Sequence, residues 1–181
     1  MHKFVIPATP GLANAIRRSL LDVKSWAPKE VVFTKNTSCF VCEFLSHRIG
    51  LIPFRKLGGE KEMKLSRIGP CSVTAADLTG PDFEPIYPNI IIAELTEGDE
   101  LDITVRFEAG TGGKHARFSP CAAIGMCKLD ASHHRVQFEL HDDSASGKQF
   151  MLSAIQNLED RVDRALLCLA KQPDPPPKSR C

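Results

Sequence analysis

The sequence lacks a long hydrophobic run, and no stretch of its 181 residues approaches the ~20 apolar residues of a membrane span. Its opening residues, MHKFVIPATPG, contain too short an apolar core for a signal peptide. An excess of one charge is also missing, since 23 basic residues stand against 22 acidic ones. Proteins that coat nucleic acid or bind membrane surfaces usually carry a basic excess. We therefore expect an intracellular protein with no membrane contact and no direct sequence-specific DNA contact.

The cysteines do not form a disulfide framework, because seven is an odd number and their spacing is irregular. Cys39, Cys42 and His47 match the first three ligands of a zinc knuckle, but Ile52 stands where the fourth ligand is needed. A second candidate cluster, without a standard spacing, comprises Cys121, Cys127, His133 and His134. We expect packing or turn roles for both clusters and no cofactor. A small zinc- or thiol-dependent binding protein remains the alternative from another functional class.

A catalytic constellation is missing as well. His2, His115 and His141 have no serine, cysteine or carboxylate partner in a recognisable motif, so nucleophilic catalysis has no support. We expect that the chain is not an enzyme by itself.

Two segments with helical periodicity lie near the ends of the chain. Thr9 and Pro10 suit the start of a helix, and Pro28 closes that segment. Residues 148–169 form the longest predicted helix, followed from Gln172 by a Pro-rich tail that we expect to be extended or disordered. Apolar residues recur at spacings of three and four in both helices: Leu12, Ile16, Leu20 and Val23, then Met151, Ile155, Leu158, Val162, Ala165 and Leu169.

The middle of the chain is predicted to be rich in β-strands. A strand at residues 30–35 precedes a short helix at 43–51, and the charged Gly-rich stretch 58–62 resembles a boundary. Residues 101–108 alternate between apolar and polar, as in a half-buried antiparallel strand. Further strands are expected at 71–75, 90–95, 115–128 and 135–140.

Two features leave a choice between a solvated surface and an interface. Four basic residues lie off the apolar stripes: Arg17, Arg18, His47 and Arg48. They fit either a solvated helix face or a cationic edge that contacts a partner. The helical stripes present at least nine apolar side chains, each worth roughly 1.5–3 kcal/mol if fully buried. So many in so small a domain favour association through helices.

Several motifs together resemble the α-like assembly subunits of cellular RNA polymerases, including the archaeal D subunit and the third-largest subunit of eukaryotic RNA polymerase II. They are ANAIRRSLL, NTSCFVCEFLSHRIGLIPF, CSVTAADL, YPNIIIAELTEGDELDITV and GGKHARFSP, in family order, followed by the final amphipathic helix. The resemblance implies an α+β fold in which a β-rich insert, residues 54–131, interrupts a dimerisation domain. That domain would have an antiparallel sheet and two helices and comprise residues 1–53 and 132–181.

The resemblance also implies partners and a function in transcription. Such a chain pairs with a smaller α-like subunit and forms the platform for the two large catalytic subunits, with small zinc-binding adaptors. The implied heterodimer seam is Leu12, Ile16, Leu20, Val23, Ile155, Leu158, Val162 and Leu169. Arg17, Arg18, His47 and Arg48 would contact the second-largest subunit or the adaptors. A self-pairing subunit of the bacterial α type is the alternative within transcription.

The sequence departs from the family in its metal-binding loop and at its C-terminus. The cysteine-rich or iron–sulfur segment of some members would lie between Leu57 and about Pro81, where only Cys71 is present. A C-terminal DNA-binding domain of the bacterial α kind is also missing. The expected compartment is the nucleus for a eukaryotic version, the cytoplasm for an archaeal one, and cytoplasm or virion for a viral one.

Overall fold

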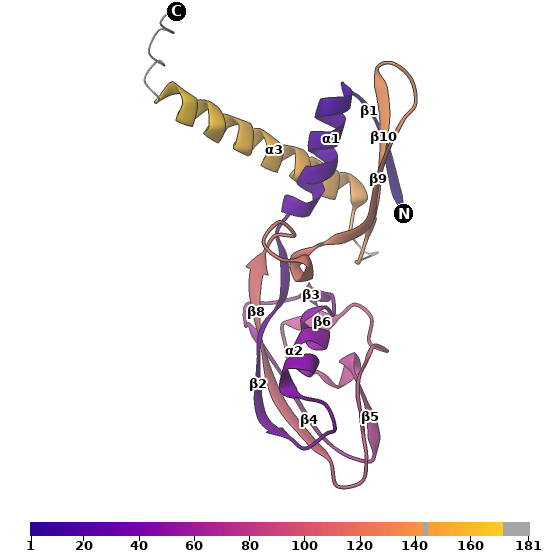
Figure 1. The fold of residues 1–181 in the computed structure, drawn as a ribbon, viewed down its shortest axis with the longest axis vertical. Helices are drawn as coiled ribbons and strands as arrows, with labels where there is room; N and C mark the ends of the chain where they lie inside the picture. The colour runs from indigo at the N-terminus through magenta and orange to yellow at the C-terminus, as the bar shows by residue number, and fades with distance from the viewer. Residues whose placement is uncertain (143–144, 172–181) are drawn as a thin grey trace, which may run out of the picture.

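The computed structural model describes residues 1–142 and 145–171, and they form two units joined end to end (Figure 1). The middle unit is built from the central part of the chain, and the terminal unit combines both ends. Antiparallel sheets and a few helices make up both, which confirms the predicted α+β class. None of the helices within the described residues is long and apolar enough to cross a membrane.

The middle unit is organised around a three-stranded antiparallel sheet with the order β2-β8-β4. Its strands are β2 (Ser25–Asn36), β8 (Glu100–Gly110) and β4 (Glu62–Ile68). The alternation in β8 is confirmed, since Leu101, Ile103, Val105 and Phe107 are all buried. The opposite face of the sheet is polar, and there Arg106 pairs with Glu30 and Glu62 on the neighbouring strands. One face therefore builds a core and the other meets solvent.

A short helix and two small antiparallel sheets cover the apolar face of this sheet. The helix is α2 (Cys42–Gly50), which confirms the helix predicted at 43–51 to within a residue. The small sheets pair β3 (Phe54–Lys56) with β6 (Phe83–Pro85), and β5 (Cys71–Thr74) with β7 (Ile91–Leu95). The enclosed core contains Leu45, Ile49, Met63, Leu65, Val73, Phe83, Ile92, Leu101, Ile103, Val105 and Phe107.

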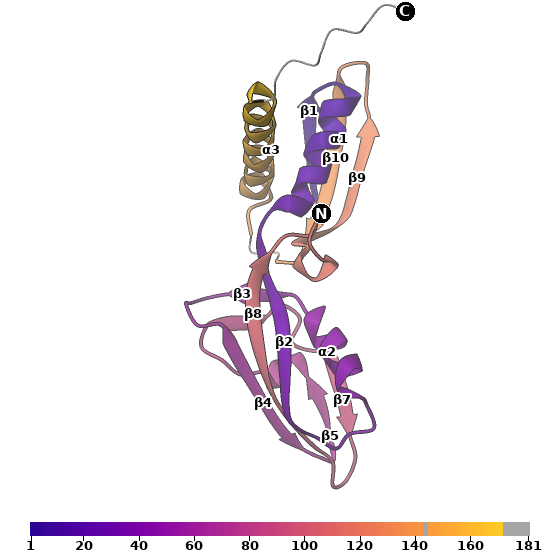
Figure 2. The same ribbon diagram turned by 60° about the vertical axis from the view of Figure 1, so that its left-hand side comes forward.

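The terminal unit is a second three-stranded antiparallel sheet with two helices on one face. The sheet has the order β1-β10-β9, with β1 (His2–Pro7), β10 (His133–Leu140) and β9 (Cys121–Lys128). Helix α1 (Pro10–Ser19) packs on β9 and β10, and α3 (Gly147–Ala170) packs on α1. In Figure 2, α3 stands on the far side of α1 from β9. Eight side chains form its buried core: Ile16, Leu20, Cys121, Val136, Phe138, Leu140, Met151 and Ala154.

The first helix starts where the sequence predicts and stops earlier. Thr9 caps it by accepting the N–H of Leu12 at 3.3 Å, and Pro10 occupies its first turn. A 3-10 helix, Leu20–Asp22, then leads directly into β2, so Pro28 lies within a strand and does not end a helix. Strand β2 tolerates it because Pro28 stands on an edge strand beside a register shift, where a missing N–H breaks no ladder hydrogen bond.

The packing also divides the chain differently from the predicted boundaries at 53/54 and 131/132. Strand β2 and helix α2 belong to the core of the middle unit, while β9 pairs with β10 in the terminal unit. The stretch 58–62 is no boundary, since β4 begins at its last residue, Glu62, and pairs along β8. The strand predicted at 115–128 is wrong in its first part, where a 3-10 helix, Ala116–Phe118, precedes β9. The predicted tail from Gln172 lies outside the described residues.

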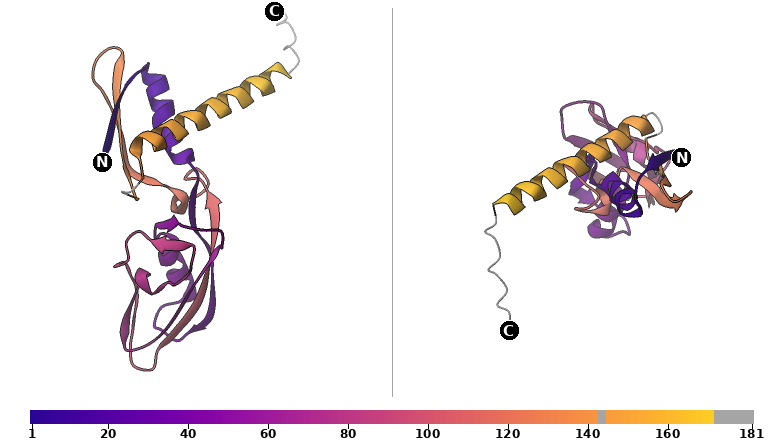
Figure 3. Two further views of the ribbon diagram at one scale, coloured as in Figure 1. Left: turned by 180° about the vertical axis from the view of Figure 1, so that it is seen from behind. Right: turned by 90° about the horizontal axis from the view of Figure 1, so that it is seen from above.

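Helix α3 is much longer than the body against which it packs. Figures 1 and 3 show that its C-terminal half projects away from α1 and the sheets. From Glu159 to Lys171 every residue is exposed. The last twelve helical residues, 159–170, thus extend roughly 18 Å, and among the described residues only the ion pair of Arg161 with Asp22 ties them to another element.

Candidate subunit interface

The projecting half of α3 carries an uncovered apolar stripe. Val162, Ala165 and Leu169 continue the spacing of three and four that begins at the buried Met151 and the half-buried Leu158. They therefore lie on the same side of the helix as the residues that pack on α1. Val162 is 50% exposed and Leu169 62%, and the neighbouring Leu166 is 58% exposed. The outer stripe is defined here as Val162, Ala165, Leu166 and Leu169.

Among the described residues, polar contacts hold α3 to the body only as far as Arg161. Asn157 donates to the carbonyl oxygen of Asp22 at 3.3 Å, and Arg161 pairs with the Asp22 carboxylate. Beyond Arg161, no hydrogen bond or ion pair joins the described part of α3 to another element. Isolated helices shorter than about 12–15 residues are marginal in water. The outer half of α3 is thus a helix that needs a neighbour.

The eight predicted seam residues divide into two groups. Ile16 and Leu20 are buried, and Val23, Ile155 and Leu158 pack against the same core of the terminal unit. The other group is exposed and consists of Leu12, Val162 and Leu169. Helical spacing treats all eight alike, so it could not separate the residues that their own chain covers from those that it leaves open.

The four predicted basic contact residues are not brought together. Arg17 and Arg18 lie on α1 in the terminal unit, whereas His47 and Arg48 lie on α2 in the middle unit (Figure 1). Arg17 donates to Asn14 Oδ1 from Nε at 3.1 Å and from Nη2 at 2.9 Å. Arg18 is exposed. The basic residues therefore mark two separate surfaces.

Helix α2 has an outer apolar stripe that the sequence analysis missed. Val41, Phe44 and Leu51 are exposed along the side of α2 that borders the buried Leu45 and Ile49, and Ile91 on β7 is exposed nearby. Helical spacing in the sequence could have revealed this stripe, because residues 41, 44, 48 and 51 share one helical face.

Arg48 lies in the middle of this stripe and is tethered to its own chain. Its Nη2 donates to the carbonyl oxygen of Ile91 at 2.6 Å, and its guanidinium lies 5.6 Å from the centre of the Phe44 ring. Among the described residues no carboxylate pairs with it. An arginine held among exposed apolar groups is typical of interface hot spots.

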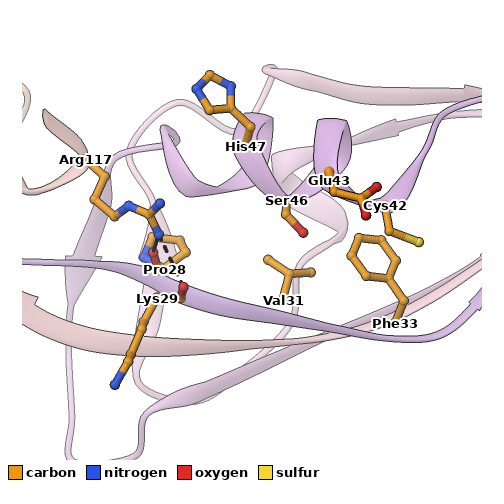
Figure 4. A pocket seen from close by; sticks show the side chains of 9 residues that line it. All are labelled: Pro28, Lys29, Val31, Phe33, Cys42, Glu43, Ser46, His47 and Arg117. Carbon is orange, nitrogen blue, oxygen red and sulfur yellow. Dashed lines mark hydrogen bonds between the residues drawn. The ribbon is translucent and has the colours of Figure 1, made fainter. Parts of the chain in front are cut away.

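His47 belongs to a different surface, a cleft between α2 and β2. Figure 4 shows the residues that line this cleft of about 410 Å³, among them Ser46, His47 and Arg117. Arg117 was also missed, because the stretch that contains it was predicted as a strand. Its Nη1 donates to the carbonyl oxygens of Pro28 at 2.9 Å and Lys29 at 3.3 Å.

The cysteine clusters do not assemble into a metal site. Within residues 1–142 and 145–171, no group of three or more His, Cys, Asp or Glu side chains is placed to hold an ion. Cys127 pairs in register with Arg135, and His134 Nδ1 instead donates to the Ala8 carbonyl oxygen, 3.0 Å away. Burial raises the pKa of the Cys121 thiol to about 12, so it stays protonated and unreactive.

Comparison with known proteins supports the resemblance seen in the sequence. The family model described as "RNA polymerase Rpb3/RpoA insert domain" matches residues 31–134. The protein named DNA-directed RNA polymerase subunit Rpo3 of Methanocaldococcus jannaschii is 35% identical over 126 residues, which cover 67% of this chain and 66% of that one. Proteins of the same name from Pyrococcus furiosus and Methanopyrus kandleri are 33% and 29% identical, over 65% and 86% of this chain.

The matched regions cover only part of those relatives. The matched regions cover 66%, 51% and 62% of the three Rpo3 proteins, so the chain spans between half and two thirds of their length.

Proposed function

The chain belongs to the family of α-like RNA polymerase subunits described as Rpb3/RpoA, and on that premise we propose that it is a non-catalytic assembly subunit of a DNA-directed RNA polymerase. In this proposal it forms the platform for the two large catalytic subunits in transcription and works inside the cell. The relatives' name supports membership of the polymerase complex. The outer stripe of α3 carries the proposal, since it is an apolar helix face that residues 1–142 and 145–171 leave open.

The proposed partner of the outer stripe is a smaller α-like subunit. Its helices would lie along Val162 and Leu169 and contact the exposed Leu12 of α1. Fully burying a Val or Leu side chain contributes about 1.5–3 kcal/mol, so a few such residues suffice to hold a heterodimer. Ile16, Leu20, Val23, Ile155 and Leu158 then act indirectly, because they hold α1 and α3 in place.

A second contact in the proposal joins α2 to the second-largest subunit or a small zinc-binding adaptor. The α2 stripe offers Phe44 and Leu51 beside Ile91, and Arg48 in its centre lacks a carboxylate partner among the described residues. An apolar partner surface with one carboxylate would complement it. Arg17 and Arg18 would serve the same large subunit from the terminal unit.

Co-purification tests the proposal. The tagged full chain, expressed with the smaller α-like subunit and the large subunits, is expected to retain all of them. Val162→Asp places a charge in a dry seam and should reduce retention of the smaller subunit at least about a hundredfold. Leu167→Asp is the matched control, because Leu167 is equally exposed but lies on the opposite side of the same turns. Ile16→Asp is a poor test, since Ile16 is 8% exposed and its loss would unfold the terminal unit.

Two results would count against this function. Equal retention of the smaller subunit by Val162→Asp and Leu167→Asp would remove the role of the outer stripe. A stable homodimer of the isolated chain in light scattering that excludes the smaller subunit would favour a self-pairing subunit of the bacterial α type.

A further inference from the structure

Strand β2 has a free edge beside the cleft in Figure 4. It pairs with β8 on one side only. Every second residue of such an edge strand turns its N–H and C=O groups outward. At the start of this edge, Arg117 donates hydrogen bonds to the carbonyl oxygens of Pro28 and Lys29. Between Glu30 and Lys35, no outward backbone group has a partner within the part of the chain that the structure describes.

The usable part of this edge is short. The pairing with β8 shifts register between Pro28 and Glu30 and again between Phe33 and Lys35, so only Glu30–Phe33 is regular. Four residues of strand extend about 13 Å. Bulges at both ends protect an edge from open-ended pairing with further copies of the chain. They leave room for a short, specific strand.

The cleft provides side-chain contacts along that stretch. Val31 and Phe33 of β2 line one wall, and Cys42 and Ser46 of α2 line the other (Figure 4). A strand added to the edge of β2 would therefore place alternate side chains under α2.

The two ends of the cleft carry opposite charges. Arg117 lies at one end and Glu43 at the other, near Cys42 (Figure 4). Arg117 donates to backbone carbonyls and to the His115 ring, and no carboxylate among the described residues pairs with it. Glu43 likewise has no cationic partner in the described ranges, whereas Lys29 is already paired with Glu108 at 3.2 Å.

We propose that this cleft binds a short extended segment of another polymerase subunit as an added strand on Glu30–Phe33. The segment carries an acidic group facing Arg117 and a basic group facing Glu43. Backbone hydrogen bonds supply the affinity, and the two charges fix the direction of the segment. The inference rests on the proposed function for the identity of the partner, and on the free edge for the mode of binding.

Residue-resolved hydrogen exchange of the full chain tests this mode. The comparison is between the heterodimer with the smaller α-like subunit and the complete complex with the large subunits. Strand addition protects alternate amides within residues 30–33, and we expect their exchange to slow at least about tenfold. Unchanged exchange would overturn the inference. Uniform protection of all four amides would also overturn it, because a surface that merely covers the edge has no alternation.

Two variants and a control sharpen the test. Ser46→Trp fills the cleft and should abolish the alternating protection, and Glu43→Lys, at an exposed position, should weaken it. Ser66→Trp, at an exposed position on β4, should leave the protection unchanged. Protection that persists in Ser46→Trp and Glu43→Lys contradicts the inference. An intact complex without alternating protection contradicts the added strand alone, whereas absence of the large subunits contradicts the proposed function as well.

Discussion

The middle and terminal units bury their apolar side chains in different ways. In the described residues, seventeen apolar side chains form one core in the middle unit, enclosed by sheet, α2 and the small sheets. The terminal unit buries eight, and its longest helix ends in twelve exposed residues. The core of the middle unit is enclosed by its own elements, and its exposed apolar stripe on α2 lies outside that core, whereas the terminal unit carries exposed apolar side chains along half of its longest helix.

The two units also meet through polar contacts. Arg55 of the middle unit holds Asp142 of the terminal unit through two 2.7 Å hydrogen bonds, from Nε and Nη2. The Tyr87 hydroxyl group donates to the carbonyl oxygen of His141 at 3.2 Å. The joint is thus a set of directional contacts, which fixes orientation without merging the two cores.

The largest expected difference concerns independent folding. Ser25 pairs with Gly110, so the chain enters and leaves the middle unit at adjacent points. A fragment of residues 24–120 should therefore unfold cooperatively on its own in a thermal melt. The terminal unit, with 2–23 linked to 119–171, should do so only when the smaller α-like subunit is added. Cooperative unfolding of the terminal fragment alone would show that the two units do not differ in independent folding.

A large loss of stability is expected from opening the closed core. Phe107 is 4% exposed, stacks on Phe83 with ring centres 3.9 Å apart and meets Phe54 edge-on. Phe107→Ala should cost about 3–5 kcal/mol in the free energy of unfolding, measured by denaturant titration. Val32→Ala, on the solvent face of the same sheet, should cost less than about 0.5 kcal/mol. Similar costs for both would mean that the sheet does not have one buried face.

A moderate effect is expected at the joint. The hydrogen bonds that Arg55 donates to Asp142 raise the pKa of Arg55, so the guanidinium stays charged. Arg55→Lys keeps the charge but loses the two-point geometry, and should broaden the distribution of distances between labels on the two units. Arg67→Ala removes an ion pair with Asp77 inside the middle unit and should not broaden that distribution. If the distance distributions of Arg55→Lys and the unaltered chain are equally wide, the Arg55–Asp142 pair does not set the relative orientation of the two units.

The smallest effect concerns the turn between β9 and β10. The backbone N–H of Ser132 and the His133 ring and N–H bond to Asp130 and lower its pKa to about 2. Because the unfolded pKa is about 3.9, this contribution is present above pH ~4 and is lost as pH falls through about 2. The protection factors of the hairpin amides, which correct for the intrinsic pH dependence of exchange, should fall over that range, and in Asp130→Asn they should stay constant. Protection of the hairpin amides that does not change with pH in the unaltered chain would contradict this.

The sequence predicted local structure well wherever one rule dominated. The alternation of β8, the N-cap of α1 and the position of α2 follow from side-chain period and backbone chemistry. Strand β2 was only half predicted, because Pro28 is compatible with a strand only at an edge and the edge is a property of the assembled sheet. The start of β4 was hidden by its charged residues, which suit the polar face of that strand.

The sequence predicted that the candidate site is an apolar helix face, but not which residues of that face are left exposed. Ile16 and Val162 follow the same helical spacing, yet the first is buried and the second is half exposed. Periodicity shows which side of a helix is apolar, and only the fold shows what covers it. His47 and Arg48 are neighbours on α2, yet they belong to different surfaces. This difference, like the cleft at Arg117, depends on packing between segments that are distant in the sequence.

Amide exchange along the outer half of α3 tests the central claim most directly. In the isolated chain, residues 159–170 are uncovered and should exchange nearly as fast as a frayed helix. Addition of the smaller α-like subunit should slow their exchange at least about a hundredfold, while the core of the middle unit stays unchanged. Exchange at 159–170 that is already slow in the isolated monomer, or that stays fast after the subunit binds, would contradict the account.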